Sequence, residues 1–363
     1  MKVAIVGGHL APALAVIKKL GKDDEIFYIG RKHSFEGDKA LSLEFQEISS
    51  LKIPFYSIKT GRLQRKLTKH SIPSLLKLPQ GFYGSYKILK KINPDVVLAF
   101  GGYISVPVVT AASFLKIPTV VHEQTFEAGM ANKVLSKIAT KVLISWESSR
   151  KHFPVKKTIL TGNTIKDEIA NVKSLEVEKN LIYVTGGSAG SHFINGLIER
   201  NLKTLLKDFT IIHQTGDSEK YNDFQRLTQI KNNLPKQIRE KYQLSKFYDS
   251  REAAENLQKS TLVIGRSGIN TVSELIFLRK AALLIPLPFA QKNEQLMNAL
   301  FLKECGLGEY LVQNEITDEI FIEKIQTMIR NIQNYKLKDN IIFDKAEDKI
   351  IKILNDVSQK KAS

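Results

Sequence analysis

The sequence contains a single cysteine, a single tryptophan and no long apolar run. Because Cys305 has no second cysteine to pair with, an intramolecular disulfide is excluded, which favours a reducing compartment. No segment approaches the roughly 18 consecutive apolar residues of a membrane-spanning helix. The first apolar run, Val3–Val6, ends at two glycines and leads into a helical pattern, which is not the pattern of an export signal. These absences predict a cytoplasmic protein that is soluble or peripheral to a membrane.

Three motifs that would identify other enzyme classes are missing. No glycine-rich turn continues into Gly-Lys-Ser or Gly-Lys-Thr, and none has the spacing G-x-G-x-x-G. This argues against P-loop ATPases and dehydrogenases. Asp-x-Asp, with which many nucleotide-sugar transferases hold a divalent metal, does not occur. We therefore expect neither a cofactor nor a metal ion.

Acidic residues are scarce relative to basic ones. The chain has 37 Asp and Glu against 54 Lys and Arg, a formal net charge of +17. Such an excess attracts anions, and the candidate partners are nucleic acid, an acidic membrane surface and phosphorylated substrates. The alternative explanation for the basic excess is a lysine-rich composition in which the lysines lie on solvent-exposed faces and bind no partner.

Short β-rich runs alternate with helical patterns along the chain. With roughly 150 residues per domain, we place domains at 1–162 and 163–338, and a charged C-terminal helix that could pack back on the first domain at 339–363. Alternating βα units predict parallel sheets, here in two doubly wound, Rossmann-like α/β domains that face a cleft. The runs are Val3–Val6, Ile26–Ile29, Val96–Phe100, Thr119–His122, Val142–Ser145, Leu181–Thr185, Phe209–Gln214, Leu262–Gly265 and Ala282–Pro286.

Glycine turns follow several of these strands, where ligands bind in sheets of this kind. A further turn, Arg266-Ser267-Gly268, leads into a helix, and a helix N-terminus attracts phosphate through free N–H groups and its dipole. Glu274 in that helix would repel phosphate, so a ribose diol suits it better. Phosphate and ribose together indicate a nucleotide site, with an ordinary strand–helix junction as the alternative. The glycine turns are Gly7-Gly8-His9, Gly101-Gly102-Tyr103 and Gly186-Gly187-Ser188.

Taken in chain order, these motifs resemble those of the MurG family. Its members are GT-B glycosyltransferases that move N-acetylglucosamine (GlcNAc) from UDP-GlcNAc to the lipid-linked muramyl-peptide precursor of peptidoglycan. The resemblance implies an inverting transfer to the acceptor C4 hydroxyl, which converts lipid I to lipid II. The matching stretches are 7–15 (GGHLAPALA), 94–97 (PDVV), 101–107 (GGYISVP), 117–118 (IP), 122–124 (HEQ), 132–133 (NK), 162–163 (GN), 186–188 (GGS), 266–268 (RSG), 271–274 (TVSE) and 294–299 (EQLMNA).

The resemblance implies that the C-terminal domain binds UDP-GlcNAc. Glu274 would hold the ribose hydroxyls, while Gln295 and Asn298 would bind the GlcNAc hydroxyls. Amides both donate and accept hydrogen bonds, as sugar hydroxyls require. Residues three apart lie on the same face of a helix, which is consistent with both amides binding one sugar. The remaining donor-binding residues would be Lys166, Gly187, Ser188 at the diphosphate, Phe247 and Tyr248 at the uracil, Arg266, Ser267, Gly268 and Glu294.

The N-terminal domain would bind the acceptor, with His9 and Glu123 as catalytic residues. His9 has a suitable intrinsic pKa for a general base, and a diphosphate-orienting role is its alternative. The chain departs from the family in this region, because the usual Gly-Gly-Thr-Gly-Gly-His turn is shortened to Gly7-Gly8-His9. Lys166 also stands where the family usually has an arginine. Lysine keeps the positive charge but cannot donate the two parallel hydrogen bonds that a guanidinium gives to one anion. The acceptor-binding residues would be Gly7, Gly8, Tyr103, Gln124 and Thr125, the last replacing an asparagine.

A lipid-linked acceptor requires contact with a membrane. The segment Arg62–Lys91 mixes cations with apolar and aromatic residues, a composition that suits an anionic bilayer surface. A core helix with a basic solvated side is the alternative. We expect peripheral binding to the cytoplasmic face of the cell membrane, and no nucleic-acid partner. The expected membrane contacts are Leu75, Leu76, Leu78, Phe82, Tyr83 and Tyr86.

Two other function classes stay open on sequence alone. One is another GT-B enzyme, either a glycolipid glycosyltransferase or a UDP-sugar epimerase. The other is a non-catalytic protein that binds UDP-sugars or lipids, which the shortened first turn makes conceivable. Turnover with a lipid-linked muramyl acceptor would discriminate among them.

Overall fold

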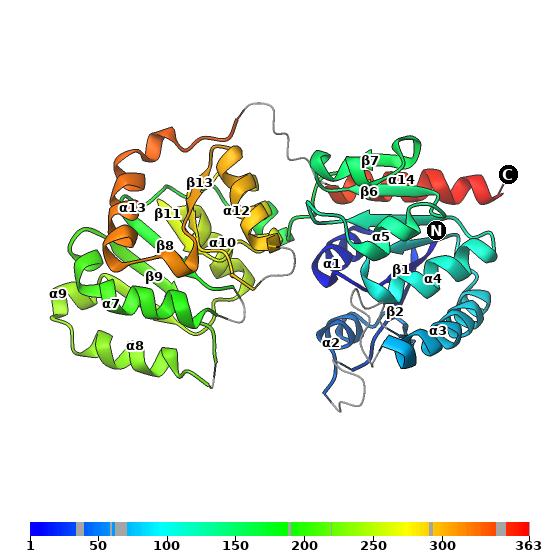
Figure 1. Cartoon of the computed structure of the whole chain (residues 1–363), viewed down its shortest axis with the longest axis horizontal. Coiled ribbons are helices and arrows are strands. Elements are labelled where there is room, and N and C mark those ends of the chain that lie inside the picture. Colours follow the sequence, from blue (N-terminus) through cyan, green and yellow to red (C-terminus); the bar gives the residue numbers. More distant parts are fainter. Residues whose placement is uncertain are drawn as a thin grey trace. The chain divides into compact units, whose positions relative to one another are not determined.

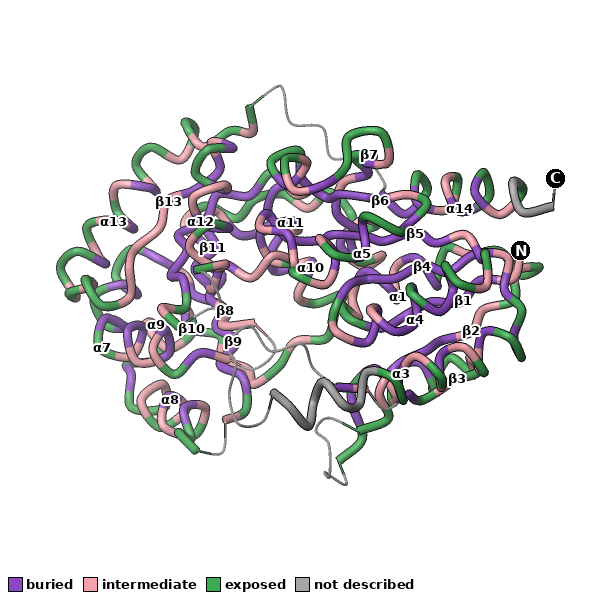
Figure 2. Tube along the Cα trace, turned by 45° about the vertical axis from the view of Figure 1, so that its right-hand side comes forward, coloured by how far each residue is buried: buried purple, intermediate pink, exposed green. Residues whose placement is uncertain are grey.

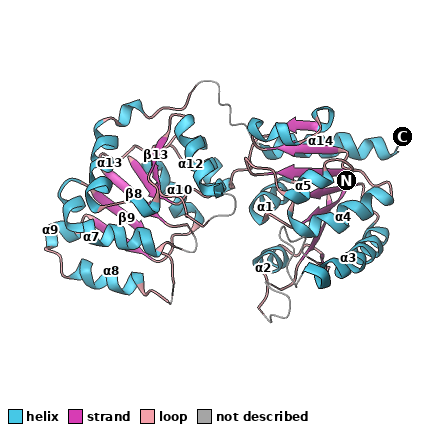
Figure 3. Ribbon diagram, in the orientation of Figure 1, coloured by secondary structure: helices cyan, strands magenta, loops and turns pink. Residues whose placement is uncertain are grey.

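The computed structural model describes residues 1–33, 40–58, 60–61, 71–187, 190–218, 220–289, 293–338 and 346–362. Side chains are described from residue 79 onward in the helix Ser71–Ile92, and up to residue 359 in the last helix. Backbone contacts divide the chain into an N-terminal unit, Met1–Thr164 with Asp344–Ser363, and a C-terminal unit, Ile165–Phe343. Each unit carries its own parallel sheet with helices packed on it (Figures 1 and 3).

The N-terminal unit is built on a seven-stranded parallel sheet with the order β3-β2-β1-β4-β5-β6-β7. Its central strands are apolar runs buried on both faces, which is the pattern of parallel strands covered by helices (Figure 2). The strands are β1 (Lys2–Val6), β2 (Glu25–Gly30), β3 (Phe55–Ser57), β4 (Val96–Ala99), β5 (Thr119–Glu123), β6 (Lys141–Ile144) and β7 (Thr158–Leu160).

Side chains alternate between two cores on the faces of this sheet. Ala4 and Val6 of β1 pack in one core with residues of α3, α4 and α5. Val3 and Ile5 pack in the other core with residues of α1, α2 and α14. The C-terminal helix thus packs in the same unit as the first strand, against α1. The helices are α1 (Leu10–Lys19), α2 (Leu43–Ser50), α3 (Ser71–Ile92), α4 (Gly102–Phe114), α5 (Met130–Leu135) and α14 (Ala346–Ala362).

The C-terminal unit is built on a six-stranded parallel sheet with the order β10-β9-β8-β11-β12-β13. Its strands are β8 (Leu181–Thr185), β9 (Thr210–Gln214), β10 (Tyr242–Ser245), β11 (Leu262–Gly265), β12 (Ala282–Leu284) and β13 (Gly308–Tyr310). Its helices are α6 (Asp167–Ala170), α7 (His192–Asp208), α8 (Asp223–Asn232), α9 (Lys236–Arg239), α10 (Ser250–Lys259), α11 (Ile269–Phe277), α12 (Glu294–Glu304) and α13 (Asp318–Arg330).

Each sheet reverses its direction of winding once. In the N-terminal unit the chain runs from β1 outward to β3, then returns to place β4 on the other side of β1. In the C-terminal unit it does the same around β8, with β11 on the far side. Ligands of open parallel sheets bind beyond the carboxyl ends of the strands at such switch points. The two predicted doubly wound α/β sheets are confirmed, and the switch points lie at the carboxyl ends of β1 and β8.

Candidate functional site

Two glycine turns meet at the switch point of the N-terminal unit. Gly7-Gly8-His9 follows β1, and Gly101-Gly102-Tyr103 follows β4. A Cβ atom on Gly8 would lie 2.2 Å from the carbonyl oxygen of Gly101, so only glycine allows the two backbones to approach this closely. Helices α1 and α4 both begin here, and their N-termini bring free N–H groups and positive dipole ends to one place. This is a backbone environment suited to an anion.

His9 lies at the start of α1 within this environment. Its side chain is exposed and makes no capping hydrogen bond to the helix. His122 of β5, in contrast, is buried. Burial is the main cause, and the charge of His9 the second, of the lowered pKa of His122, which is about 4. His122 is therefore neutral at pH 7, with its Nε2 atom 3.3 Å from the Ser145 hydroxyl. The structure thus presents His9 to solvent at the turn and keeps His122 inside the fold.

Glu123 is buried and its carboxylate is surrounded by donors. One oxygen accepts from the backbone N–H of Thr125 at 3.0 Å, and the Thr125 hydroxyl lies 2.6 Å from it. The other oxygen accepts from the Gly129 N–H at 2.8 Å and from the Asn132 amide at 3.0 Å. A carboxylate held by this many donors orders the loop between β5 and α5. The geometry suits a positioning role better than removal of a proton from substrate.

The other expected acceptor residues lie around the same loop and turn. Trp146 donates its indole N–H to the backbone carbonyl of Gln124 at 2.8 Å, which fixes the segment after β5. Tyr103, in the first turn of α4, lies beneath the guanidinium of Arg31 at 5.5 Å. Arg31 was not predicted as a site residue, because it lies outside the glycine motifs.

Glu274 of α11 forms an ion pair in the C-terminal unit. Lys166 places its Nζ atom 3.3 Å from a Glu274 oxygen, and the Glu274 side chain is 14% exposed. Burial is the largest influence and raises the pKa of Glu274, while Lys166 opposes the rise. The helix begins at Ile269, so Glu274 lies in its second turn. The two predicted donor residues are therefore brought together.

The turn after β11 is joined to α12 by hydrogen bonds. The Ser267 hydroxyl donates to the backbone carbonyl of Gln295 at 2.7 Å, and the Asn298 amide donates to the Ser267 carbonyl at 2.9 Å. Asn298 is 1% exposed, and its Oδ1 atom has no partner among the described residues. A buried acceptor of this kind calls for a donor from a ligand or water. Glu294 occupies the first position of the same helix.

Arg266 has a structural role in the same turn. Its guanidinium donates to the backbone carbonyls of Ile285 at 3.0 Å and Pro286 at 3.3 Å, which holds the end of β12 beside β11. Burial lowers the pKa of Arg266 to about 10, so the group is still charged at neutral pH. Contacts to carbonyls of the fold indicate that Arg266 fixes the turn after β11 against the end of β12, while Gly268 caps α11.

The remaining donor residues lie around the end of β8. The carbonyl of Gly187 accepts from the side chain of Gln214 at 3.3 Å. The ring of Tyr248 packs edge-on against Tyr183 of β8 at 6.4 Å, and Phe247 is half-exposed. Tyr183 was not predicted, since it lies inside an apolar strand run. Ser188, predicted at the diphosphate, falls outside the residues that the structure describes.

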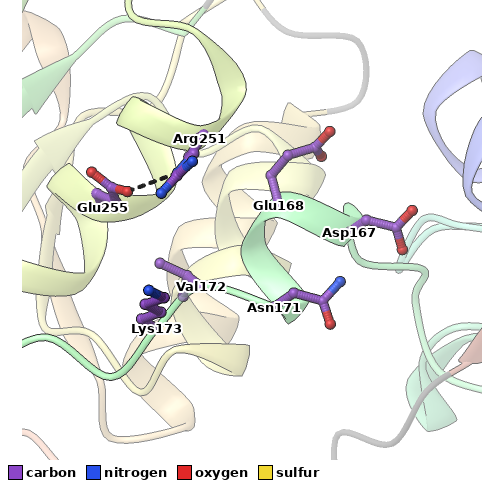
Figure 4. Close-up of a pocket in the computed structure, with 7 residues that line it drawn as sticks. All are labelled: Asp167, Glu168, Asn171, Val172, Lys173, Arg251 and Glu255. Carbon is purple, nitrogen blue, oxygen red and sulfur yellow. Dashed lines mark hydrogen bonds and ion pairs between the residues drawn. The ribbon is translucent and has the colours of Figure 1, made fainter.

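A hollow of about 370 Å³ lies beside α6 in the C-terminal unit. Figure 4 shows it between α6 with its following segment and α10, where Arg251 pairs with Glu255 at 3.1 Å. Three carboxylates and two cations line it, a balance that does not favour a diphosphate. None of its lining residues was predicted for the donor. The lining residues are Asp167, Glu168, Asn171, Val172, Lys173, Arg251 and Glu255.

Family models match both units of the chain. The glycosyltransferase family 28 N-terminal domain matches residues 6–144, and the C-terminal domain of the same family matches residues 181–354. The chain belongs to glycosyltransferase family 28. The sequence-based prediction of a glycosyltransferase is thereby confirmed.

Within family 28, the chain is similar over most of its length to proteins of the MurG branch. The chain is 34% identical over 348 residues to a protein of Clostridium botulinum (strain Alaska E43 / Type E3), covering 92% of this chain and 91% of that one. It is 30% identical to one of Lachnospira eligens, covering 98% of each. Both relatives are called UDP-N-acetylglucosamine–N-acetylmuramyl-(pentapeptide) pyrophosphoryl-undecaprenol N-acetylglucosamine transferase.

Solved structures share the fold. MurG of Acinetobacter baumannii superposes with a TM-score of 0.78 at 24% identity, covering 98% of this chain and 99% of that one. A UDP-GlcNAc 2-epimerase from Neisseria meningitidis, bound to UDP-GlcNAc, gives 0.65 at 16% identity, covering 98% and 100%. At these identities the similarity establishes the GT-B fold of this family 28 member.

An aromatic surface lies on α3 and α4 of the family 28 N-terminal domain. Tyr83 is 58% exposed, and the Lys87 ammonium lies 4.5 Å from the centre of its ring. Phe114, which was not predicted, is 72% exposed and packs edge-on against Phe82 and Tyr86. Its exposure at the end of an apolar helix could not be deduced from the apolar pattern. The side chains of Leu75, Leu76 and Leu78 lie outside the described part of the chain.

Neither a membrane-spanning helix nor a cluster of metal ligands occurs among the described residues. No helix among them is long and apolar enough to cross a bilayer. No group of three or more His, Cys, Asp or Glu side chains within the described ranges could hold a metal ion.

Proposed function

We propose that this family 28 enzyme transfers GlcNAc from UDP-GlcNAc to the C4 hydroxyl of the lipid-linked muramyl-peptide, converting lipid I to lipid II in peptidoglycan synthesis. Relatives that share 30–34% identity over at least 90% of the chain are named as N-acetylglucosamine transferases that act on this precursor. The observation that carries the proposal is the donor arrangement at the end of β11. There a mostly buried carboxylate, Glu274, and two amides, Gln295 and Asn298, are held in one unit.

The donor side follows from the hydrogen-bonding capacity of these groups. The Glu274 carboxylate accepts from both hydroxyls of a ribose, and Lys166 then loses its partner and is available to a phosphate. Asn298 presents to a sugar hydroxyl the Oδ1 atom that has no partner within the described ranges. The amide of Gln295 accepts from the Leu287 backbone N–H at 2.9 Å, which sets its orientation before ligand binds. Neutral sugar hydroxyls require such groups that both donate and accept.

The acceptor side is built at the first switch point. The C4 hydroxyl attacks the anomeric carbon from the face opposite UDP, the C1–O bond to UDP breaks, and the hydroxyl proton passes to a base. His9 is the candidate for this base, because it is the exposed histidine at the glycine turns. Glu123 acts through the loop that it orders. The N-termini of α1 and α4 stabilise the acceptor diphosphate.

The membrane side supports a peripheral location at the cytoplasmic face of the cell membrane. Tyr83 and Phe114 offer an amphipathic and an apolar ring, and the Lys87 ammonium of α3 lies over the Tyr83 ring. On the neighbouring helix α5, Met130 and Val134 are also exposed, next to Lys133. Exposed apolar groups among cations suit an anionic bilayer. The proposed reaction is a step of cell-wall biogenesis, and through it contributes to cell shape and division.

A UDP-sugar epimerase is the second candidate, because an epimerase bound to UDP-GlcNAc shares the fold. Incubation of the enzyme with UDP-GlcNAc alone, followed by NMR of the sugar, separates the two. The transferase leaves the donor unchanged until a lipid-linked muramyl acceptor is added, and then releases UDP. Formation of an epimeric UDP-sugar without acceptor would contradict the proposal.

A further inference from the structure

Arg31 lies one residue beyond the carboxyl end of β2. In the sheet, β2 and β4 flank β1 on opposite sides, with Val6 of β1 paired to Ile29 and to Ala99. Adjacent strands are about 4.8 Å apart, so side chains that follow β2 and β4 can meet only above the end of β1. Arg31 and Tyr103 do meet, since the guanidinium carbon lies 5.5 Å from the centre of the Tyr103 ring. The Gly7-Gly8-His9 turn begins at this point.

Glu44 holds Arg31 from the other side. The backbone N–H of Arg31 donates to the Glu44 carboxylate at 2.6 Å, and its Nε atom lies 3.7 Å from the same oxygen. Glu44 is buried against the turn, because a Cβ atom on Gly7 would lie 2.5 Å from its other oxygen. The Arg31 side chain nevertheless stays 33% exposed. An arginine fixed by a ring and a carboxylate loses little further freedom when it binds a ligand.

The first turn of this chain is shorter than the Gly-Gly-Thr-Gly-Gly-His turn typical of the family. A shorter turn offers fewer backbone N–H groups to an anion. Arginine supplies five N–H donors in a fork that matches phosphate oxygens. The guanidinium stands beside the shortened turn and carries the charge that a diphosphate needs.

We propose that Arg31 binds the diphosphate of the lipid-linked acceptor, with Tyr103 and Glu44 as its positioning residues. This inference rests on the proposed function, since it concerns the same acceptor site. Arg31 then donates hydrogen bonds to the diphosphate in addition to those of the shortened Gly7-Gly8-His9 turn.

The kinetic test compares Arg31→Ala, Arg31→Lys and the control Lys32→Ala in the full chain. Lys32 carries the same charge on the next residue, but its ammonium lies 5.4 Å from the Phe45 ring of α2. Loss of a charge-assisted contact raises the KM for a lipid-linked muramyl acceptor by about 10-fold to 100-fold in Arg31→Ala. The KM for UDP-GlcNAc should not change, Arg31→Lys should recover part of the loss, and Lys32→Ala should match wild type. An unchanged acceptor KM in a folded Arg31→Ala variant would overturn the inference.

A binding test keeps the inference separate from the proposed reaction. Calorimetric titration with farnesyl diphosphate, and with farnesol as the control ligand, measures diphosphate recognition without turnover. Wild type and Lys32→Ala should bind farnesyl diphosphate equally, and Arg31→Ala should bind it about 10-fold more weakly or worse. If wild type transfers no GlcNAc but shows this pattern, the proposed function fails and the Arg31 site stands. Equal binding by wild type and Arg31→Ala, or no binding by wild type, overturns the site. Fluorescence of Trp146 checks that each variant is folded.

Discussion

At the scale of single residues, side chains from distant segments of the chain lie together at the candidate site. Glu274 and Lys166 come from separate motifs and form an ion pair. Glu123 was predicted as catalytic from its motif, yet its four close donors indicate that it orders a loop. Arg31 escaped prediction, because only the strand order brings the end of β2 beside the turn after β1. A residue's role depends on contacts between distant segments, which a single sequence does not contain.

Replacing Glu274 by Gln should weaken UDP binding without weakening the fold. Loss of charge-assisted bonds to the ribose corresponds to about 10-fold to 150-fold in the Kd. Burial raises the pKa of Glu274, so the native state holds the proton more tightly than the unfolded chain. The stability from this group is therefore present below the unfolded pKa and is lost as pH rises through the folded pKa.

Glu274→Gln should thus equal or exceed wild type in free energy of unfolding at pH 7, and differ least at acid pH. Titration calorimetry with UDP and urea unfolding at two pH values measure both effects. Wild-type affinity for UDP in the folded variant would remove Glu274 from the donor site.

Replacing His9 by Ala tests the base. If His9 takes the proton, kcat should fall by roughly 10² to 10⁴, because that is the usual contribution of a general base, while UDP binding stays intact. The acidic limb of the pH–rate profile should then vanish or move. A rise in acceptor KM with the acidic limb retained would instead assign His9 to the diphosphate, and an unaffected enzyme would exclude both roles.

At the scale of elements, every interior strand of the two sheets, as the structure describes them, was predicted, and the strands that were missed are the sheet edges. β3, β7, β10 and β13 lie at the ends of the two strand orders. Interior parallel strands are buried on both faces and form continuous apolar runs, which a sequence displays. Edge strands such as Phe55–Ser57 and Gly308–Glu309–Tyr310 are short and partly exposed, and pair on one side only. Their composition therefore resembles that of loops.

The aromatic surface on α3 and α4 should bind anionic lipid. Tyr83→Ser and Phe114→Ser should each reduce the fraction bound to vesicles containing an anionic phospholipid, and salt should reduce binding of wild type by screening. Ile320→Ser is the matched control, because Ile320 is 41% exposed on α13 of the other unit. Vesicle sedimentation measures the bound fraction. Equal losses in Ile320→Ser and Phe114→Ser would show that the surface has no special affinity for lipid.

At the scale of the whole molecule, the last helix belongs to the first unit. Ile350, Leu354 and Val357 of α14 are buried in the core that contains Val3 and Ile5 of β1. The sequence suggested that this helix could pack back on the first domain, whereas the core residues that it contacts required the three-dimensional structure. The two parallel sheets were accessible from sequence, since the βα alternation occurs twice.

A chain ending at residue 338 should lose stability in the N-terminal unit alone. Three buried aliphatic side chains at about 1.5–3 kcal/mol each correspond to several kcal/mol of unfolding free energy. The only tryptophan, Trp146, lies in that unit and reports its unfolding separately. The urea midpoint followed by Trp146 fluorescence should fall, while UDP affinity stays near that of the full chain. An unchanged midpoint would contradict the packing of α14 on this core.

The most direct measurement is the mass of the product formed from a lipid-linked muramyl-peptide and a panel of UDP-sugars, in the presence of EDTA. UDP-GlcNAc should add one N-acetylhexosamine to the acceptor and release UDP, and UDP-GalNAc and UDP-glucose should add little. EDTA should leave the rate unchanged, because Asp-x-Asp is absent from the sequence. An acceptor of unchanged mass, with wild-type protein that still binds UDP, would contradict the assignment as a GlcNAc transferase of this precursor.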